Sequence, residues 1–391
     1  MNPVNVNRIL FVGTGGGNDI FSTFVAVASL WTEGWRWTAC DIAGVISPFH
    51  THTVVPTDIP GVFLTTPNTT RHLLSKAGPG KSINFVDAKV AEIVAQSHPY
   101  KMSSVLALSV EQGSVGLTAA FAQLSKEYDI IVLVDAGGDC FYSGADDKHI
   151  LSPMFDSMIV RAFVDSGAKG VLFEVGPGTD GELEPDSLTR ALVANGGMEN
   201  AKPLRSRVMN WWEEQYSKWI EPYRPGRTVP ITLQAFRSAE LFLQMDYRAR
   251  AHFGGTHRYK YFTQTISTEL CKKFYLVDPS RIKNPFAVSC ASPVEWFLKT
   301  QVACRHTNNE ANLEYIKMSN GELWQFLTPS PLLGTKDREE LINLGLQNLS
   351  QGVNDGAWIM PWDWRFHRSS YWESQFAVST ATESNLLVCR R

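Results

Sequence analysis

The sequence predicts an α/β fold: a Rossmann-like, mostly parallel twisted sheet flanked by helices, with a C-terminal α+β extension or cap. Three observations predict it. Short β-rich runs alternate with helix-like segments through the first half of the chain, which is typical of βαβ units. Several of the expected strands are followed at once by glycine-rich segments. The chain has 391 residues, 44% of them apolar, so it can bury a substantial core.

The first half supplies most of the expected elements. Strands are predicted, in chain order, at residues 8–13, 40–47, 82–86, 104–110, 129–135 and 170–176. Helices are predicted between them, at residues 19–31, 113–128 and 152–167. Because the carboxyl ends of parallel strands meet at one edge of a sheet, the glycine-rich segments should converge there, where open α/β folds bind ligands.

The character of the sequence changes near residue 200. Tryptophans and charged helix-like stretches become frequent, and strand signals remain only at 227–236 and 272–278. We therefore divide the chain into a Rossmann-like ligand-binding core at 1–200 and a C-terminal extension or cap at 201–391. The extension is either separate from or continuous with the core, and its aromatic tail at 355–391 is a candidate interface for a homodimer or higher homo-oligomer.

Composition narrows the classes of function. The chain has 36 basic and 39 acidic residues and a net charge of -3, so no overall basic field attracts nucleic acid. Its six cysteines include no C-x-x-C pair, which indicates a reduced compartment. It shows neither a cationic, apolar leader nor a run of about eighteen apolar residues. We expect a cytoplasmic protein with no nucleic-acid or membrane partner.

The first glycine loop is GTGGGND at residues 13–19. It begins like the dinucleotide pattern G-x-G-x-x-G, but Asn18 stands where the third glycine belongs, and the strand expected at 40–47 ends in Ser47 rather than an acid. No Gly-Lys-Ser/Thr of a Walker loop follows. These departures argue against NAD as a cofactor and against ATP-driven P-loop chemistry.

The same loop still suits an anionic ligand. Consecutive glycines let backbone N–H groups approach an anion, and a helix N-terminus follows. The candidate ligand-binding residues are Gly15, Gly16, Gly17 and Asn18. Asp19 either caps the helix or binds a ligand hydroxyl or a divalent cation, and we place it among the catalytic candidates.

The second glycine loop, VDAGGDCFYSGADDKH at residues 134–149, is the richest in carboxylates. Asp135 ends an apolar strand and Asp139 follows Gly137 and Gly138. With Asp146 they offer oxygen ligands for Mg²⁺ or Mn²⁺, or a base with a raised pKa. The alternative is a hydrophilic turn whose aspartates cap and solvate the backbone. We take Asp135 and Asp139 as catalytic candidates, and Gly137 and Gly138 as candidate ligand-binding residues.

The third loop, EVGPGTDGELEPD at residues 174–186, again pairs glycines with acids. Its candidate ligand-binding residues are Gly176, Gly178, Asp180 and Glu182, whereas Glu184 and Asp186 are explained as charges at a helix start.

Three further residues are weaker candidates. Glu111 follows another predicted strand and is a possible ligand contact. His50 and His52, in SPFHTH, alternate on an extended segment and would either bind a metal or lie in an exposed loop.

The segments GTGGGNDIFSTFVAVASL, VDAGGDCFYSGADD, SPMFDSM and FEVGPGTDGEL resemble, in that order, segments of the uncharacterised DUF1152 family. The likeness covers residues 8–190. Family members resemble Gly-Gly-Gly-Gly-Asp at the first loop, where this chain has Asn18 before Asp19. The resemblance implies a Rossmann-like fold and a three-loop site, and it implies no activity.

From the three loops we expect an enzyme that acts on a nucleotide-like or phosphorylated small molecule by group transfer or hydrolysis. The alternative is a non-catalytic nucleotide-binding sensor or regulatory module, and an NAD(P)-dependent oxidoreductase ranks third. The cofactor would be Mg²⁺ or Mn²⁺ if one is used, and the partner a small anionic ligand.

Overall fold

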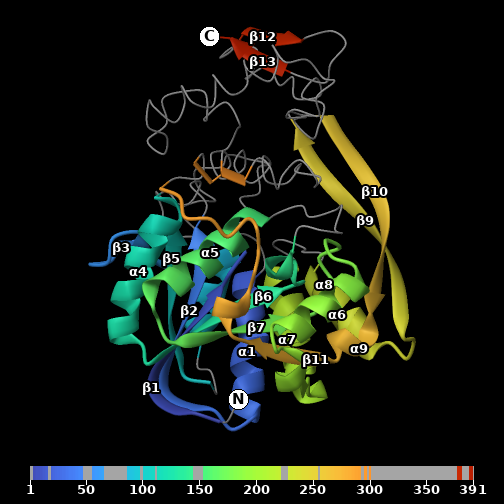
Figure 1. Ribbon diagram of the computed structural model, residues 1–391. Coiled ribbons are helices and arrows are strands. Elements are labelled where there is room, and N and C mark those ends of the chain that lie inside the picture. The colour runs from blue at the N-terminus through green and yellow to red at the C-terminus, as the bar shows by residue number, and fades with distance from the viewer. Residues whose placement is uncertain are drawn as a thin grey trace.

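A single large sheet forms the centre of the computed structural model (Figure 1). The structure describes residues 3–15, 19–46, 55–65, 86–96, 100–110, 112–143, 153–221, 228–253, 256–291, 295–296, 299–300, 377–380 and 387–390. Within these ranges the sheet has nine strands in the order β3-β4-β5-β2-β1-β6-β7-β11-β8. Their bounds are β1 Asn5–Gly13, β2 Arg36–Ile46, β3 Val55–Pro56, β4 Val62–Thr65, β5 Met102–Ser109, β6 Ile130–Ala136, β7 Gly170–Val175, β8 Lys202–Pro203 and β11 Lys273–Val277.

The five central strands are parallel, and their order is that of a Rossmann fold. β5, β2, β1, β6 and β7 pair in parallel, each with its neighbour. Counted along the chain, their spatial order is 3-2-1-4-5. The direction of winding therefore reverses between β1 and β6, and ligands of open α/β sheets bind at this reversal.

Helices cover both faces of the sheet (Figure 1). Their bounds are α1 Asp19–Thr32, α3 Val86–Val94, α4 Gly113–Glu127, α5 Pro153–Ser166, α6 Pro185–Ala194, α7 Ser206–Gln215, α8 Thr228–Arg237 and α9 Thr268–Cys271. Side chains of α4, α5 and α6 pack with Leu10 and Val12, whereas those of α1, α3, α7 and α8 pack with Ile9 and Phe11. Strand β1 is thus apolar on both faces, as a parallel strand covered by helices on both sides must be.

Antiparallel strands complete the edges of the sheet. β4 pairs with β5 at one side, and β11 pairs with both β7 and β8 at the other. Two further antiparallel pairs lie outside this sheet: β9 (Phe242–Phe253) with β10 (Thr256–Ser267), and β12 (Ala377–Thr380) with β13 (Leu387–Arg390). The long β9–β10 ribbon extends away from the sheet (Figure 1).

The predicted α/β class and the mostly parallel sheet are confirmed. The division of the chain at residue 200 stays a prediction, although β8 and β11 lie in the same sheet as the strands of the first half. None of the helices in the described ranges is both long and apolar enough to cross a membrane.

Two predictions of secondary structure are wrong. The segment 227–236, expected as a strand, contains helix α8, and residue 86, expected at the end of a strand, begins α3. In α8 the β-branched residues mislead, because Val229 and Ile231 are buried by tertiary packing on a helix. Pro230 is tolerated because its missing N–H falls in the first helical turn, where no helical partner exists. Residues 82–85 lie outside the described ranges.

Gly13 lets helix α1 begin directly against the end of β1. A Cβ at Gly13 would lie 2.5 Å from the Asp19 carbonyl carbon and 2.5 Å from the Ile20 nitrogen, both backbone atoms. The close helix–strand packing that a dinucleotide loop assigns to its third glycine is thus carried here by its first.

We therefore expect Gly13→Ala to lower the free energy of unfolding by about 1–3 kcal/mol, the usual range for overpacking a buried site. Chemical denaturation measures it. Gly167→Ala is the control, since its Cβ would meet nothing within 4 Å and it adds only the cost of a φ of +67°. Equal destabilisation by the two substitutions would contradict the steric explanation.

Candidate functional site: a buried carboxylate cluster

The three glycine loops follow β1, β6 and β7, which are neighbours in the sheet, so their acids meet at one edge. Around them seven carboxyl groups gather, which we call the acid cluster: Asp19, Asp135, Asp139, Asp156, Glu174, Asp180 and Glu182. Six of them are buried, with at most 7% of the residue exposed, and only Asp19 is partly exposed. A group of seven carboxyl groups, most of them buried from solvent, is the defining feature of this edge.

Regular elements position most of the acid cluster. Asp135 and Glu174 lie in β6 and β7, and Asp19 is the first residue of α1. Asp156 lies in the first turn of α5, and Asp139 opens a short 3-10 turn at Asp139–Phe141. The positive ends of two helices thus face the acids and partly offset their repulsion.

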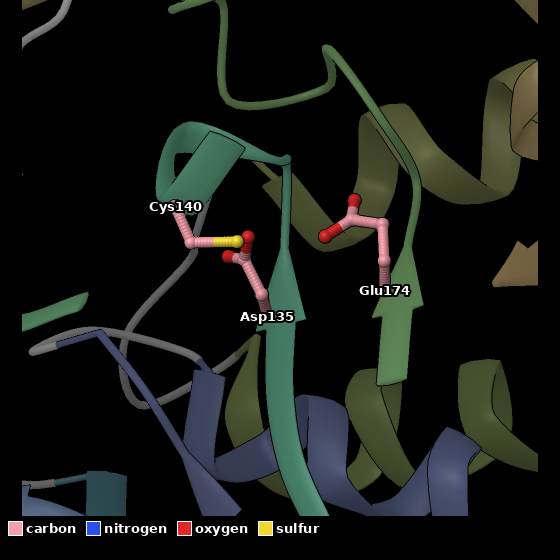
Figure 2. A group of neighbouring side chains, drawn as sticks. All are labelled: Asp135, Cys140 and Glu174. Carbon is pink, nitrogen blue, oxygen red and sulfur yellow. The ribbon is translucent and has the colours of Figure 1, made fainter. Parts of the chain in front are cut away.

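Asp135 and Glu174 are register partners on adjacent strands, and Cys140 lies beside them (Figure 2). One ligand atom from each of the three lies within 4.8 Å of the other two. Burial raises the pKa of Glu174 well above its ordinary value, and the charge of Asp135 raises it further. Burial also raises the pKa of Asp135 and of the Cys140 thiol. Both directions favour a protonated carboxyl group where Asp135 and Glu174 meet.

Neither oxygen of Asp135 receives a hydrogen bond from the described residues, and the same is true of Glu174. The Cys140 thiol, the Glu174 carboxyl and the backbone N–H groups of Ala136 and Cys140 lie close enough to favour the ionised form of Asp135, but none of them has the geometry of a hydrogen bond. Such orphaned oxygens are rare in protein interiors and need an explanation.

Asp19, Asp135 and Asp156 form a second group whose ligand atoms lie within 4.8 Å of one another. Burial raises the pKa of Asp19 well above its ordinary value, and the charges of Asp156 and Asp135 add to the effect. The pKa of Asp156 is likewise well raised, by burial and then by Asp135. Gly15 allows this approach, because a Cβ there would collide with the Asp19 carboxylate.

Asp139, Asp180 and Glu182 form a third group of the same compactness. Burial raises the pKa of Asp139 well above its ordinary value, followed by the charges of Asp156 and Glu182. The loop is held by a hydrogen bond of 2.9 Å from the Glu182 N–H to Asp180 Oδ1. Gly137, at a φ of +127°, is needed because a Cβ there would collide with the Asp180 side chain.

Asp41, also buried, shows how this protein accommodates an isolated carboxylate. It accepts hydrogen bonds from Arg8 at 2.9 Å, Tyr128 at 2.8 Å and Ser103 at 2.6 Å. Within the described ranges no lysine or arginine forms an ion pair with these five members: Asp19, Asp135, Asp139, Asp156 and Glu174.

Two chemical roles suit such a cluster. Protons or divalent cations must offset its charge, because buried carboxylates without counter-charge are costly. Carboxyl groups with raised pKa values also serve as general acids and bases near neutral pH.

The structure brings together ten of the predicted site residues: Asp19, Asp135, Asp139, Gly15, Gly137, Gly138, Gly176, Gly178, Asp180 and Glu182. Seven others lie outside the described ranges: Gly16, Gly17, Asn18, His50, His52, Glu111 and Asp146. Their proposed roles stay predictions.

The glycines after β6 and β7 hold the loops to each other. The Gly137 N–H donates to the Val175 carbonyl, and the Gly178 N–H donates to the Gly137 carbonyl. An anion would therefore have to displace these bonds to use the two N–H groups, and the role of these amides in anion binding stays a prediction.

Sequence reasoning missed Asp156 and Glu174 as site residues. Asp156 looks like an ordinary acid in a first helical turn, and only the fold shows that α5 begins at the acid cluster. Glu174 carried a signal, since a glutamate inside the apolar run GVLFEV is unusual for a buried strand.

Comparison with known proteins adds a family. A family model described as "Protein of unknown function (DUF1152)" matches residues 10–220, just over half of the 391 residues. The match spans all seven members of the acid cluster. No curated protein and no solved structure matches the chain.

The raised pKa of Glu174 predicts a pH-dependent stability difference from Glu174→Gln in metal-free buffer. The folded state holds this proton more tightly than the unfolded state, so wild type loses stability relative to the variant as pH rises above about 4.3, the ordinary glutamate value. The difference should grow by on the order of 1 kcal/mol per pH unit until the folded pKa is passed.

Denaturation curves from pH 4 to pH 8 measure this difference, and Glu269→Gln controls for the loss of one exposed negative charge. A difference between wild type and Glu174→Gln that stays constant with pH would show that Glu174 is ionised in the folded protein.

Proposed function

This chain belongs to the DUF1152 family, and we propose that it is an enzyme acting on a phosphorylated or nucleotide-like small molecule by group transfer or hydrolysis. The observation that carries the proposal is the acid cluster at the β1/β6 reversal of a Rossmann-ordered sheet. A structural role explains it poorly, because buried unneutralised carboxylates reduce stability and are retained mainly at functional sites.

The position of the acid cluster supports a small-molecule site. Ligands of open α/β sheets bind beyond the carboxyl ends of the strands at the reversal of strand order. Asp19 follows β1 and Asp139 follows β6, so the acid cluster lies at that place. The N-termini of α1 and α5 face the same edge and would attract a phosphate group.

The charge of the acid cluster restricts how a phosphate is bound. A phosphate oxygen placed directly against ionised carboxylates would be repelled, so protons or cations must lie between them. This requirement favours phosphoryl chemistry, in which cations bridge the protein carboxylates and the phosphate oxygens.

Acid–base catalysis follows from the raised pKa values. Asp139 is buried, with 7% of the residue exposed, and follows β6 at the reversal of strand order; we assign it the general base. It would accept the proton of the attacking water or hydroxyl, while a protonated carboxyl group of the cluster returns one to the leaving oxygen. Asp135, which is wholly buried, and Asp19, which begins helix α1, would position the reacting groups.

The test is a turnover screen of nucleotides and sugar phosphates with Mg²⁺ or Mn²⁺, scored by phosphate release and by product formation. We expect at least one compound to be converted, and Asp139→Asn to lower kcat by about 100-fold or more through loss of the base. Asp165→Asn, an exposed acid at the other end of α5, is the matched control and should leave kcat unchanged.

Two outcomes would contradict the proposal. Undiminished turnover in Asp139→Asn would remove the acid–base role of that residue. Thermal stabilisation by a nucleotide without conversion of any compound would favour the non-catalytic nucleotide-binding module instead.

A further inference from the structure

We infer that Asp19, Asp135 and Asp156 together bind one divalent cation of the Mg²⁺ or Mn²⁺ class. The inference deepens the proposed function and rests on it for the cation's role in catalysis. The three residues come from three separate elements, α1, β6 and α5, and their ligand atoms lie within 4.8 Å of one another.

The orphaned oxygens point to a missing ligand at this position. Asp135 has 0% of its surface exposed, and neither of its oxygens receives a hydrogen bond from the described residues. Asp156 is 3% exposed, and its Oδ1 also receives no hydrogen bond from the described residues. Carboxylate oxygens removed from water without donors are costly, and a coordinated cation is one of the few partners that offsets the cost.

The dimensions suit a small, oxygen-binding cation. Mg²⁺ takes oxygen ligands at about 2.0–2.1 Å, so ligand oxygens on opposite sides of it are about 4 Å apart. Neighbouring ligand oxygens of an octahedral ion are about 3 Å apart. Small rotations of the three side chains would bring their oxygens from within 4.8 Å of one another to these spacings. Such a cation keeps several further positions for water and for substrate phosphate oxygens.

Access distinguishes this position from its nearest competitor. Asp19 is partly exposed, so this group lies nearer to solvent. The group of Asp135, Cys140 and Glu174, drawn in Figure 2, contains no exposed member. Each of the three residues is 0% exposed. The group also contains a sulfur ligand, which selects softer metals such as Zn²⁺.

The helix starts favour the same assignment. Asp19 and Asp156 are held by the first turns of α1 and α5, so backbone geometry fixes their approach to Asp135. Gly15 leaves the space that the Asp19 carboxylate occupies, since any Cβ at this position would overlap it. Metal ligands on regular elements are positioned more rigidly than ligands on loops.

The experiment is Mn²⁺ titration of the full chain, followed by the loss of the electron paramagnetic resonance signal of free Mn²⁺. We expect saturable binding to wild type, and competition by Mg²⁺. Asp156→Asn should weaken the affinity by about 10-fold or more, because it removes one anionic ligand. Asp165→Asn, on the same helix, should bind as wild type does.

Thermal unfolding of the same proteins separates binding from misfolding. Without metal, Asp156→Asn should be at least as stable as wild type, since it removes repulsion from a cluster of acids. With Mn²⁺, wild type should gain stability and Asp156→Asn should gain little. A variant that unfolds at lower temperature without metal would contradict the repulsion on which the inference depends.

Three results would overturn the site. The first is that wild type binds no Mn²⁺ at millimolar metal, and the second is that Asp156→Asn binds Mn²⁺ as tightly as wild type. The third is a thiolate charge-transfer band on adding Co²⁺, which would place the metal at Cys140. Mn²⁺ binding without turnover of any phosphorylated compound would leave the metal site standing and overturn the proposed function alone.

Discussion

Burial and mutual repulsion of seven carboxyl groups govern the carboxyl edge of this sheet. Asp135 is wholly buried on β6, between β1 and β7. Burial is the largest cause that raises the pKa values of Asp19, Asp156 and Glu174, and the charge of Asp135 adds to it in all three. No ion pair from the described lysines and arginines relieves this charge at Asp135. The folded chain must therefore take up protons or cations to remain stable, and either event couples folding to the chemistry of the site.

The fold supplies what this repulsion requires. Parallel strands bring the ends of β1, β6 and β7 to one edge, and the apolar helices on both faces exclude water from it. Two glycines make close approach possible. Gly13 leaves room for the start of helix α1, and Gly137 leaves room for the Asp180 side chain. The contrast with Asp41, which has three hydrogen-bond partners, shows that the same sheet can satisfy a buried acid fully where no ligand is needed.

The sequence was informative where local pattern and tertiary structure agree. Alternating strands and helices predicted the α/β sheet, and glycines directly after strands predicted which acids would meet. Asp156 was not predicted as a site residue, because its place in the acid cluster depends on the direction of α5, which no local sequence pattern shows. Helix α8 was misread, because β-branched residues around Pro230 were buried by tertiary packing rather than by strand pairing. Glu174 stands out in the sequence as a glutamate within an apolar strand. That it lies beside Asp135 follows only from the register of β6 and β7.

The most direct measurement is anomalous diffraction from crystals of the protein soaked in Mn²⁺. We expect an anomalous peak bounded by the carboxylates of Asp19, Asp135 and Asp156. The metal site would be contradicted if crystals at saturating Mn²⁺ showed no peak at the acid cluster and its carboxyl groups were joined in proton-sharing pairs. In that case protons alone would stabilise the fold.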